Sequence, residues 1–216
     1  VTNCEIGYIG GSNLSSTVRY GNGIQFWSGT ENSNVAYNWI YQIFDTAISF
    51  QGTDGKNYVN VNFNNNLMEY NDMDIELWDS QPNYEIRNCH VDNNIMRFNG
   101  YGWGTRLNDG GIRGGEVSLM LKFYSCSYCE ISFKNNIIDK NNYRAVVFQK
   151  PPTSANHITV SGNTVFADSS HSNNIAVVIG TLVKDAAGQV FTAASTSKNY
   201  KADNQAALEE ALRAFD

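Results

Sequence analysis

The sequence predicts an all-β protein: a right-handed parallel β-helix, a solenoid of about six to seven coils, with a short C-terminal α-helix. Three observations predict this fold: a repeat of about 28 residues, an asparagine at one fixed place in most copies, and pairs of apolar residues two apart later in each copy. A unit of this length cannot bury its inner face alone, so neighbouring units are expected to stack.

The repeat is marked by asparagines that follow one apolar residue by three positions and precede another by two. They are Asn38, Asn66, Asn94, Asn136 and Asn163. Successive members are 28, 28, 42 and 27 residues apart, so one interval is irregular. A further copy is expected at the start of the chain, where residues 3–6 superpose on residues 88–91 and Ile9 takes the place of the Asn. Stacked Asn side chains would lie ~4.8 Å apart and would hydrogen-bond along the stack.

A second strand is predicted in each unit by pairs of apolar residues two positions apart. These pairs are Ile24/Phe26, Ile48/Phe50, Ile75/Leu77 and Val146/Phe148. Successive strand residues point to opposite faces, so the paired residues should point into the solenoid and the residues between them outward. The abundance of Asn and Gly, which disfavour helix interiors, agrees with short strands joined by turns. Neither the dense Leu pattern of leucine-rich repeats nor a helical period is present.

In several turns an Asn stands two residues before an apolar residue, as in Asn38-Trp39-Ile40 and Asn163-Thr164-Val165. These turns resemble those of the pectate-lyase-like superfamily of right-handed β-helix repeat proteins. The resemblance extends over about residues 1–180. It implies a β-helix that is active on carbohydrate. The paired-Asp and Gly-His-Gly signatures expected of polygalacturonases are not visible in the sequence, and neither is a clear calcium-binding Asp cluster of classical pectate lyases.

The chain is expected to form one β-helix domain over residues 1–180 and a C-terminal segment over residues 181–216. Its first residues have the pattern of a strand interior, so the natural protein is expected to extend further at this end. The irregular interval contains the Gly-rich residues 100–115, which are predicted to form a loop on the binding face. A helix is predicted over residues 203–216, because Asp203 can cap it and its apolar residues fall on one face.

The charge balance restricts the partners. A net charge of −6 without a Lys/Arg cluster argues against nucleic acid and against an anionic membrane. No apolar run approaches the ~18 residues that a membrane span needs. We therefore expect a secreted, periplasmic or cell-surface monomer whose partner is a polysaccharide or oligosaccharide. No cofactor is expected, and a bound calcium ion stays open as an alternative.

The four cysteines are expected to have structural roles. Cys4 and Cys89 are predicted to occupy the same inward position three coils apart, which separates them by ~14 Å and is too far for a disulfide. Cys126 and Cys129 form a lone Cys-x-x-Cys pair without further ligands, so no metal site is predicted. This pair is expected to be reduced, with a local disulfide as the alternative.

The candidate site lies on one of the second strands. Because Ile75 and Leu77 should point inward, Asp74, Glu76 and Trp78 should point outward together. Side chains two apart on one face lie ~6–7 Å apart at their bases, which brackets the carboxyl separations of retaining and inverting glycoside hydrolysis. Asp74 and Glu76 are therefore a candidate acid and base pair.

Neighbouring units add further polar and aromatic groups to this face. Asp45 and Asp72 stand at the turn just before the same strand in adjacent units, so four acids gather on two coils. An indole stacks on the apolar face of a pyranose while amides and carboxylates bind its hydroxyls. The residues expected to bind substrate are Trp27, Trp78, Trp103, Arg106, Gln25 and Gln51.

The sequence thus predicts a polysaccharide-degrading, glycoside hydrolase-like enzyme that binds glycan along an outer face of the β-helix. Glu76 is the predicted general acid, with Asp74 or Asp45 as base or nucleophile.

Two alternatives remain open at this stage. One is a polysaccharide lyase or epimerase acting on uronate-containing glycans, in which Arg106, Arg113 or Arg144 binds a carboxylate. Tyr101 or Lys122 would then be the base that removes a proton. The other is a glycan-binding, adhesin-like or fibre β-helix without catalysis.

Overall fold

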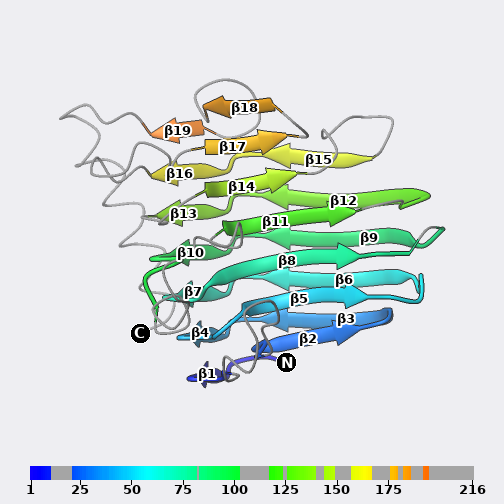
Figure 1. The fold of residues 1–216 in the computed structure, drawn as a ribbon, viewed down its shortest axis with the longest axis horizontal. Coiled ribbons are helices and arrows are strands. Elements are labelled where there is room, and N and C mark those ends of the chain that lie inside the picture. The colour runs from blue at the N-terminus through cyan, green and yellow to red at the C-terminus, as the bar shows by residue number, and fades with distance from the viewer. Residues whose placement is uncertain are drawn as a thin grey trace.

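The computed structural model is an all-β parallel solenoid in which the strands of about four turns stack one above another (Figure 1). It describes residues 1–10, 21–81, 83–102, 117–123, 126–139, 144–148, 157–166, 176–179, 182–185 and 192–194. The predicted β-solenoid is confirmed, whereas the predicted number of coils stays a prediction. Every regular element within the described ranges is a strand, and the helix predicted over residues 203–216 lies outside them.

The strands form three sheets, which we number in the order in which the chain visits them. Sheet 1 contains β1 (Glu5–Gly7), β4 (Trp39–Tyr41), β7 (Leu67–Glu69), β10 (Ile95–Arg97), β13 (Ile137–Asp139), β16 (Thr164–Phe166) and β19 (Thr192–Ala194). Sheet 2 contains β2 (Ile24–Trp27), β5 (Thr46–Gly52), β8 (Met73–Asp79), β11 (Val117–Phe123), β14 (Arg144–Phe148), β17 (Ala176–Ile179) and β18 (Leu182–Asp185). Sheet 3 contains β3 (Thr30–Ala36), β6 (Tyr58–Asn64), β9 (Glu85–Asp92), β12 (Tyr128–Lys134) and β15 (Ile158–Ser161).

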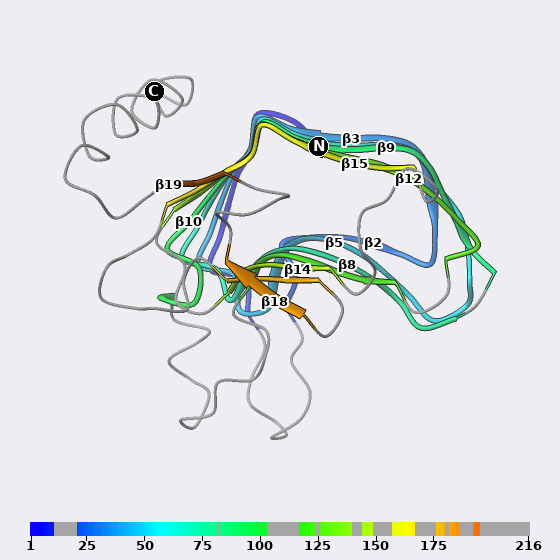
Figure 2. The same cartoon turned by 90° about the horizontal axis from the view of Figure 1, so that it is seen from above.

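The pairing pattern explains why residues about 28 apart become neighbours. In sheet 1, β4 pairs with β7 and β7 with β10, all in parallel. Seen along the stack, the strands of each sheet superimpose and the three sheets enclose the core (Figure 2). Among the described strand pairs only β17 and β18 are antiparallel. Matching offsets in successive turns therefore lie in vertical rows.

A tight corner precedes each strand of sheet 1 and explains the doubled asparagines of the repeat. Its first residue has a left-handed backbone, with φ of 57° at Asn65, 59° at Asn93, 54° at Asn135 and 68° at Gly162. Asn and Gly adopt this conformation with the least strain. One residue thus turns the chain, and the asparagine that follows it points into the stack.

These following residues form the predicted inner ladder, which consists of Asn38, Asn66, Asn94, Asn136 and Asn163. All five side chains are buried. Each of the first four donates its Nδ2 to the Oδ1 of the next at 2.9, 3.0, 3.1 and 2.8 Å. The same Oδ1 atoms also accept the backbone N–H of the residue below, as Asn94 Oδ1 does from Asn66 N at 3.0 Å. The ladder therefore satisfies backbone groups as well as side chains.

The expected alignment of the first copy is wrong. Cys4 N donates to Asn38 Oδ1 at 3.1 Å, and Glu5 pairs with Trp39, so Cys4 and not Ile9 stands at the ladder position. Cys4 is exposed and lies in front of sheet 1, whereas Cys89 is buried in β9 of sheet 3. The predicted equivalence of the two cysteines is therefore also wrong. The cause is the spacing, because the first two ladder positions are 34 residues apart rather than 28.

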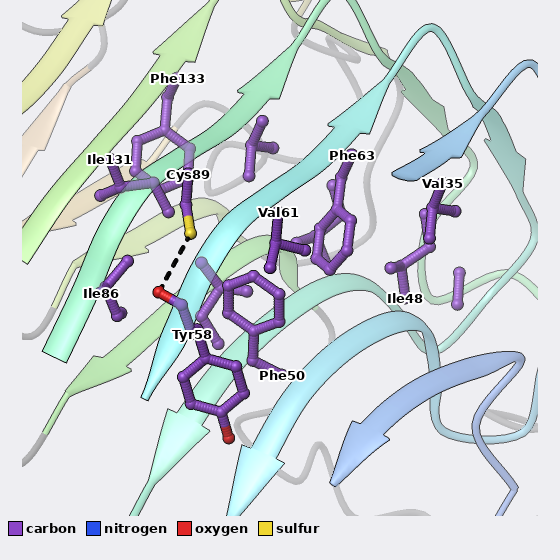
Figure 3. Packing of buried hydrophobic residues seen from close by; sticks show 14 of the residues in the cluster. Val35, Ile48, Phe50, Tyr58, Val61, Phe63, Ile86, Cys89, Ile131 and Phe133 are labelled. Carbon is purple, nitrogen blue, oxygen red and sulfur yellow. Dashed lines mark hydrogen bonds between the residues drawn. The ribbon is translucent and has the colours of Figure 1, made fainter. Parts of the chain in front are cut away.

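The core is a continuous apolar column contributed by all three sheets (Figure 3). Phe50 stacks on Tyr58 with ring centroids 4.6 Å apart and lies 4.8 Å from Phe63. Cys89 fills the same interior as a free thiol, with its Sγ 3.6 Å from the Tyr58 carbonyl. The apolar pairs of sheet 2, such as Ile48/Phe50 and Ile75/Leu77, point inward as predicted.

The irregular interval of 42 residues contains a strand that was not predicted. β11 (Val117–Phe123) lies between β8 and β14 in sheet 2, so the solenoid continues through the interval. The signal for it was the alternation of Val117, Leu119, Leu121 and Phe123. The remaining Gly-rich stretch over residues 103–116 lies outside the described residues.

One carboxyl group points into the core at the end of β8. Asp79 is buried, and its Oδ2 would lie 2.5 Å from a Cβ at Gly52, so a glycine is required opposite it. Burial raises the pKa of the Asp79 carboxyl above its ordinary value of 3.8, and the charge of Asp54 acts in the same direction. The hydrogen bond from the Gln81 N–H opposes this shift.

This burial predicts a pH dependence of stability. The folded chain binds the Asp79 proton more tightly than the unfolded chain, so the carboxyl favours folding most below about pH 3.8. That contribution decreases as the pH rises from there to the raised folded pKa, and is constant above it. In the Asp79→Asn variant this decrease should be absent. The unfolding free energy of the variant minus that of the wild type should therefore increase from about pH 3 to about pH 7. Urea denaturation across this range measures the difference, and parallel pH profiles would contradict the assignment.

Candidate functional site

The outer face of sheet 2 has the rows that the sequence predicts. Gln25 pairs with Ser49, and Ser49 pairs with Glu76. The next outward row runs through Trp27, Gln51 and Trp78 in the same three strands. The strand alternation therefore brings these predicted residues onto one face of β2, β5 and β8.

Glu76 is held by hydrogen bonds from the neighbouring strand. Gln51 Nε2 donates to Glu76 Oε2 at 2.5 Å, and Thr46 Oγ1 donates to the same oxygen at 3.5 Å. The residue is 8% exposed, so its side chain is buried. Both contacts fix the direction of the carboxyl group.

Gln51 is itself fixed by two further amides. Its Oε1 accepts hydrogen bonds from Gln25 Nε2 and from Asn22 Nδ2, the latter at 3.1 Å. Asn22 Oδ1 in turn accepts the backbone N–H of Thr46 at 3.1 Å. Because the Oε1 of Gln51 is an acceptor, its Nε2 is the atom that faces Glu76. We name Asn22, Gln25, Gln51 and Glu76 the amide relay.

Two of the three other predicted acids, Asp72 and Asp74, are buried. Asp74 is completely buried, and its Oδ1 accepts a hydrogen bond from Asn71 Nδ2 at 3.1 Å. Asn71 also accepts the Ile43 N–H at 3.0 Å, so it belongs to the buried corner between sheets 1 and 2. Asp72 is buried at the same corner, at 3% exposure, whereas Asp45 is half-buried. Asp45 and Asp72 do lie directly before β5 and β8, as predicted.

The predicted aromatic residues are placed at the rim of this face. Trp27 is 53% exposed, and Trp78 is half-buried two rungs away, with Gln51 between them. Trp103 and Arg106 lie outside the described residues. The structure therefore places Glu76, Gln25, Gln51, Trp27 and Trp78 together.

Two contributors to the site were missed by the sequence reasoning. Thr46 begins β5 and Asn22 lies just before β2, and a hydroxyl and an amide at these places carry no pattern that marks them. The row also continues into β11, where Met120 pairs with Glu76 and Lys122 with Trp78. The backbone register thus carries these rows through β11, which lies between β8 and β14.

No metal centre is formed by the described side chains, since no group of three or more His, Cys, Asp or Glu is placed to hold an ion. Cys126 is half-buried and Cys129 is buried, and Cys126 Sγ donates to the Tyr128 carbonyl at 2.8 Å. In the described ranges no helix has the length and apolar character of a membrane span.

The outer face of sheet 2 therefore combines one fixed carboxyl group, a chain of oriented amides and two indoles. Comparisons of the chain with models of protein families, with curated proteins and with solved structures find no match in any of the three.

Proposed function

We propose that this chain binds a polysaccharide along the outer face of sheet 2 and hydrolyses a glycosidic bond beside Glu76. The observation that carries the proposal is the Glu76 carboxyl, which is buried on the outer side of sheet 2 and held there by Gln51 and Thr46. An oriented carboxyl is what general acid catalysis of glycoside hydrolysis needs. Trp27 and Trp78 flank Gln51 and provide indole surfaces for sugar rings.

We assign the catalytic roles of the predicted acids from their positions and their exposure. Glu76 donates its proton to the glycosidic oxygen, and the leaving sugar departs with that proton. Asp45, half-buried before the adjacent strand, activates the water or attacks the anomeric carbon. Asp74 has no exposed surface and holds Asn71, so it positions the corner instead of contacting substrate.

A digestion screen with mixed polysaccharides and end-group analysis tests this proposal. Hydrolysis is expected to release new reducing ends without a product that absorbs in the ultraviolet. An unsaturated, absorbing product would replace hydrolysis by β-elimination and support the lyase alternative. Neither product nor binding with any polymer would contradict the proposal.

The amide relay predicts a positioning role for Gln51. Replacing Gln51 with Ala removes a donor to Glu76 and an acceptor for Gln25 and Asn22. We expect kcat to fall about 10- to 100-fold with KM nearly unchanged and with an altered pH profile. Gln25→Ala, at the exposed end of the relay, is the matched control and should have a smaller effect. Equal kinetics of both variants would contradict the role of Gln51.

A second candidate function is glycan binding without turnover. It is favoured by the burial of Asp72, Asp74 and Glu76, which leaves Asp45 as the most exposed of the four predicted acids. Stable complex formation without any product over long incubation would support it.

We further propose that the solenoid is right-handed, as parallel crossover connections nearly always are, and that it belongs to the pectate-lyase-like superfamily. A polymeric substrate lies outside the cell, which supports a secreted or surface location. The protein is proposed to act as a monomer without a cofactor, and a bound calcium ion remains the alternative.

A further inference from the structure

Sheet 1 carries a set of aromatic side chains that lies apart from the Glu76 site. Two of them, Trp39 and Tyr41, point outward from β4. The others stand at the corner that follows the first four strands of sheet 1, where the successive residues are Tyr8, Gln42, Tyr70 and Phe98. We name Tyr8, Trp39, Tyr41, Tyr70 and Phe98 the aromatic strip.

The backbone at this corner makes the aromatic residues unexpected. Tyr8, Tyr70 and Phe98 each have φ of 55°. A left-handed backbone costs a residue with a Cβ roughly 1–2 kcal/mol, and for bulky side chains it is rare outside functional sites. At the opposite corner of sheet 1 the chain uses Asn65, Asn93 and Asn135, which suit this backbone, and a tyrosine, Tyr37, in one turn.

Burial does not explain why aromatic residues stand there. Tyr8 is 69% exposed, Trp39 40% and Tyr70 36%. The Tyr8 side chain, the most exposed of the three, gains little of the hydrophobic free energy that would offset the backbone strain. A role for the exposed ring faces in contact with a ligand is therefore the better explanation.

The rings are held in fixed orientations. Trp39 and Tyr41 stack with centroids 4.6 Å apart, and Tyr8 meets Tyr41 edge-on at 5.5 Å. Higher in the stack, the rings of Tyr70 and Phe98 are nearly parallel and stack with their centroids 4.7 Å apart. The strip is thus organised before any ligand arrives, which lowers the entropic cost of binding.

Carboxylates hold the polar edges of two rings. Trp39 Nε1 donates to Glu69 Oε2 at 2.8 Å, and Glu69 also pairs with Arg97. Tyr41 OH donates to Glu5 Oε1 at 2.7 Å, and this hydrogen bond raises the pKa of the Tyr41 phenol, which stays neutral. Ring faces bordered by carboxylates and hydroxyls match the two surfaces of a pyranose, one apolar and one rich in hydroxyls.

We infer that the aromatic strip is a second glycan-binding surface, which anchors a long polysaccharide chain lying along the axis of the solenoid. Each turn advances ~4.8 Å, so a linear polymer in this direction meets ring after ring. Two separate binding surfaces raise the affinity for a long polymer and leave short oligosaccharides unaffected. The inference rests on the proposed function only in that its ligand is also a glycan.

The test replaces two corner residues with the residue type that the backbone prefers. In the Tyr8→Asn/Tyr70→Asn double variant, native gels containing soluble xylan, laminarin, dextran or polygalacturonate measure binding. We expect the dissociation constant for the polymer that retards the wild type to rise at least about tenfold, with the melting temperature changed by a few degrees at most. Tyr37→Asn, an exposed left-handed tyrosine at the opposite corner, is the matched control and should bind as the wild type.

Each other outcome overturns the inference. Unchanged binding of the double variant, equal loss in Tyr37→Asn, or a wild type that none of the polymers retards would all contradict it. Loss of a self-associated species in sedimentation, without an effect on polymer binding, would identify the strip as a protein interface instead. The proposal for Glu76 is tested separately, by the cleavage of short oligosaccharides. The strip variants should retain this cleavage.

Discussion

Replacing Glu76 with Gln should abolish turnover of the polysaccharide while the solenoid stays folded. The amide keeps the size of the side chain and can still accept the hydrogen bond from Gln51. It cannot donate a proton to the leaving oxygen, so we expect kcat to fall about 10²- to 10⁴-fold with similar binding of the polymer. End-group analysis with the substrate identified in the screen measures this loss.

Glu31→Gln is the matched control, since Glu31 is an exposed glutamate on sheet 3. It should retain wild-type activity, which separates the loss of a specific acid from a loss of surface charge. Wild-type activity of Glu76→Gln would end the assignment of the acid. Loss of activity together with a lowered melting temperature would place Glu76 in the fold instead of the chemistry.

Replacing Asn94 with Ala should have the largest effect on stability. The change leaves the buried N–H of Asn66 and the buried carbonyl of Phe63 without the partners that Asn94 supplies at 3.0 and 2.7 Å. It also removes the Nδ2 donor to Asn136. Each buried polar group left unsatisfied costs about 1–3 kcal/mol, so the loss approaches the total stability of a typical domain.

Asn62→Ala provides the control on the adjacent coil, because Asn62 is half-buried on the outward row of β6. We expect urea denaturation to show a change within about 0.5–1 kcal/mol for this variant and soluble, folded protein. The Asn94 variant should unfold at far lower urea concentration or fail to accumulate. Similar midpoints for the two variants would show that the inner ladder does not hold the stack.

The parts of the fold that the sequence predicts best are those with a strict alternation. Ile48/Phe50 and Ile75/Leu77 set the two faces of sheet 2, and a one-residue slip would expose them, so their register is strongly determined. The same alternation placed Gln51 and Glu76 on one outer face. The inner ladder followed from the constant spacing of the asparagines.

Other features depend on contacts that a linear pattern does not contain. A strand of three residues such as β1 has one inward position, Ile6, and this was too little to fix the alignment of Cys4. The burial of Asp74 comes from a corner residue, Asn71, that no strand pattern includes. The left-handed backbone of Tyr8 and Tyr70 cannot be seen in the residue types, because tyrosine is not typical of this conformation.

A crystal structure of the Glu76→Gln variant with an oligosaccharide of the preferred polymer tests the central claim, that the outer face of sheet 2 is where the glycan reacts. We expect sugar rings on Trp27 or Trp78, with one glycosidic oxygen about 3 Å from the side chain at position 76. A glycan bound elsewhere on the solenoid, with this face empty, would contradict the claim.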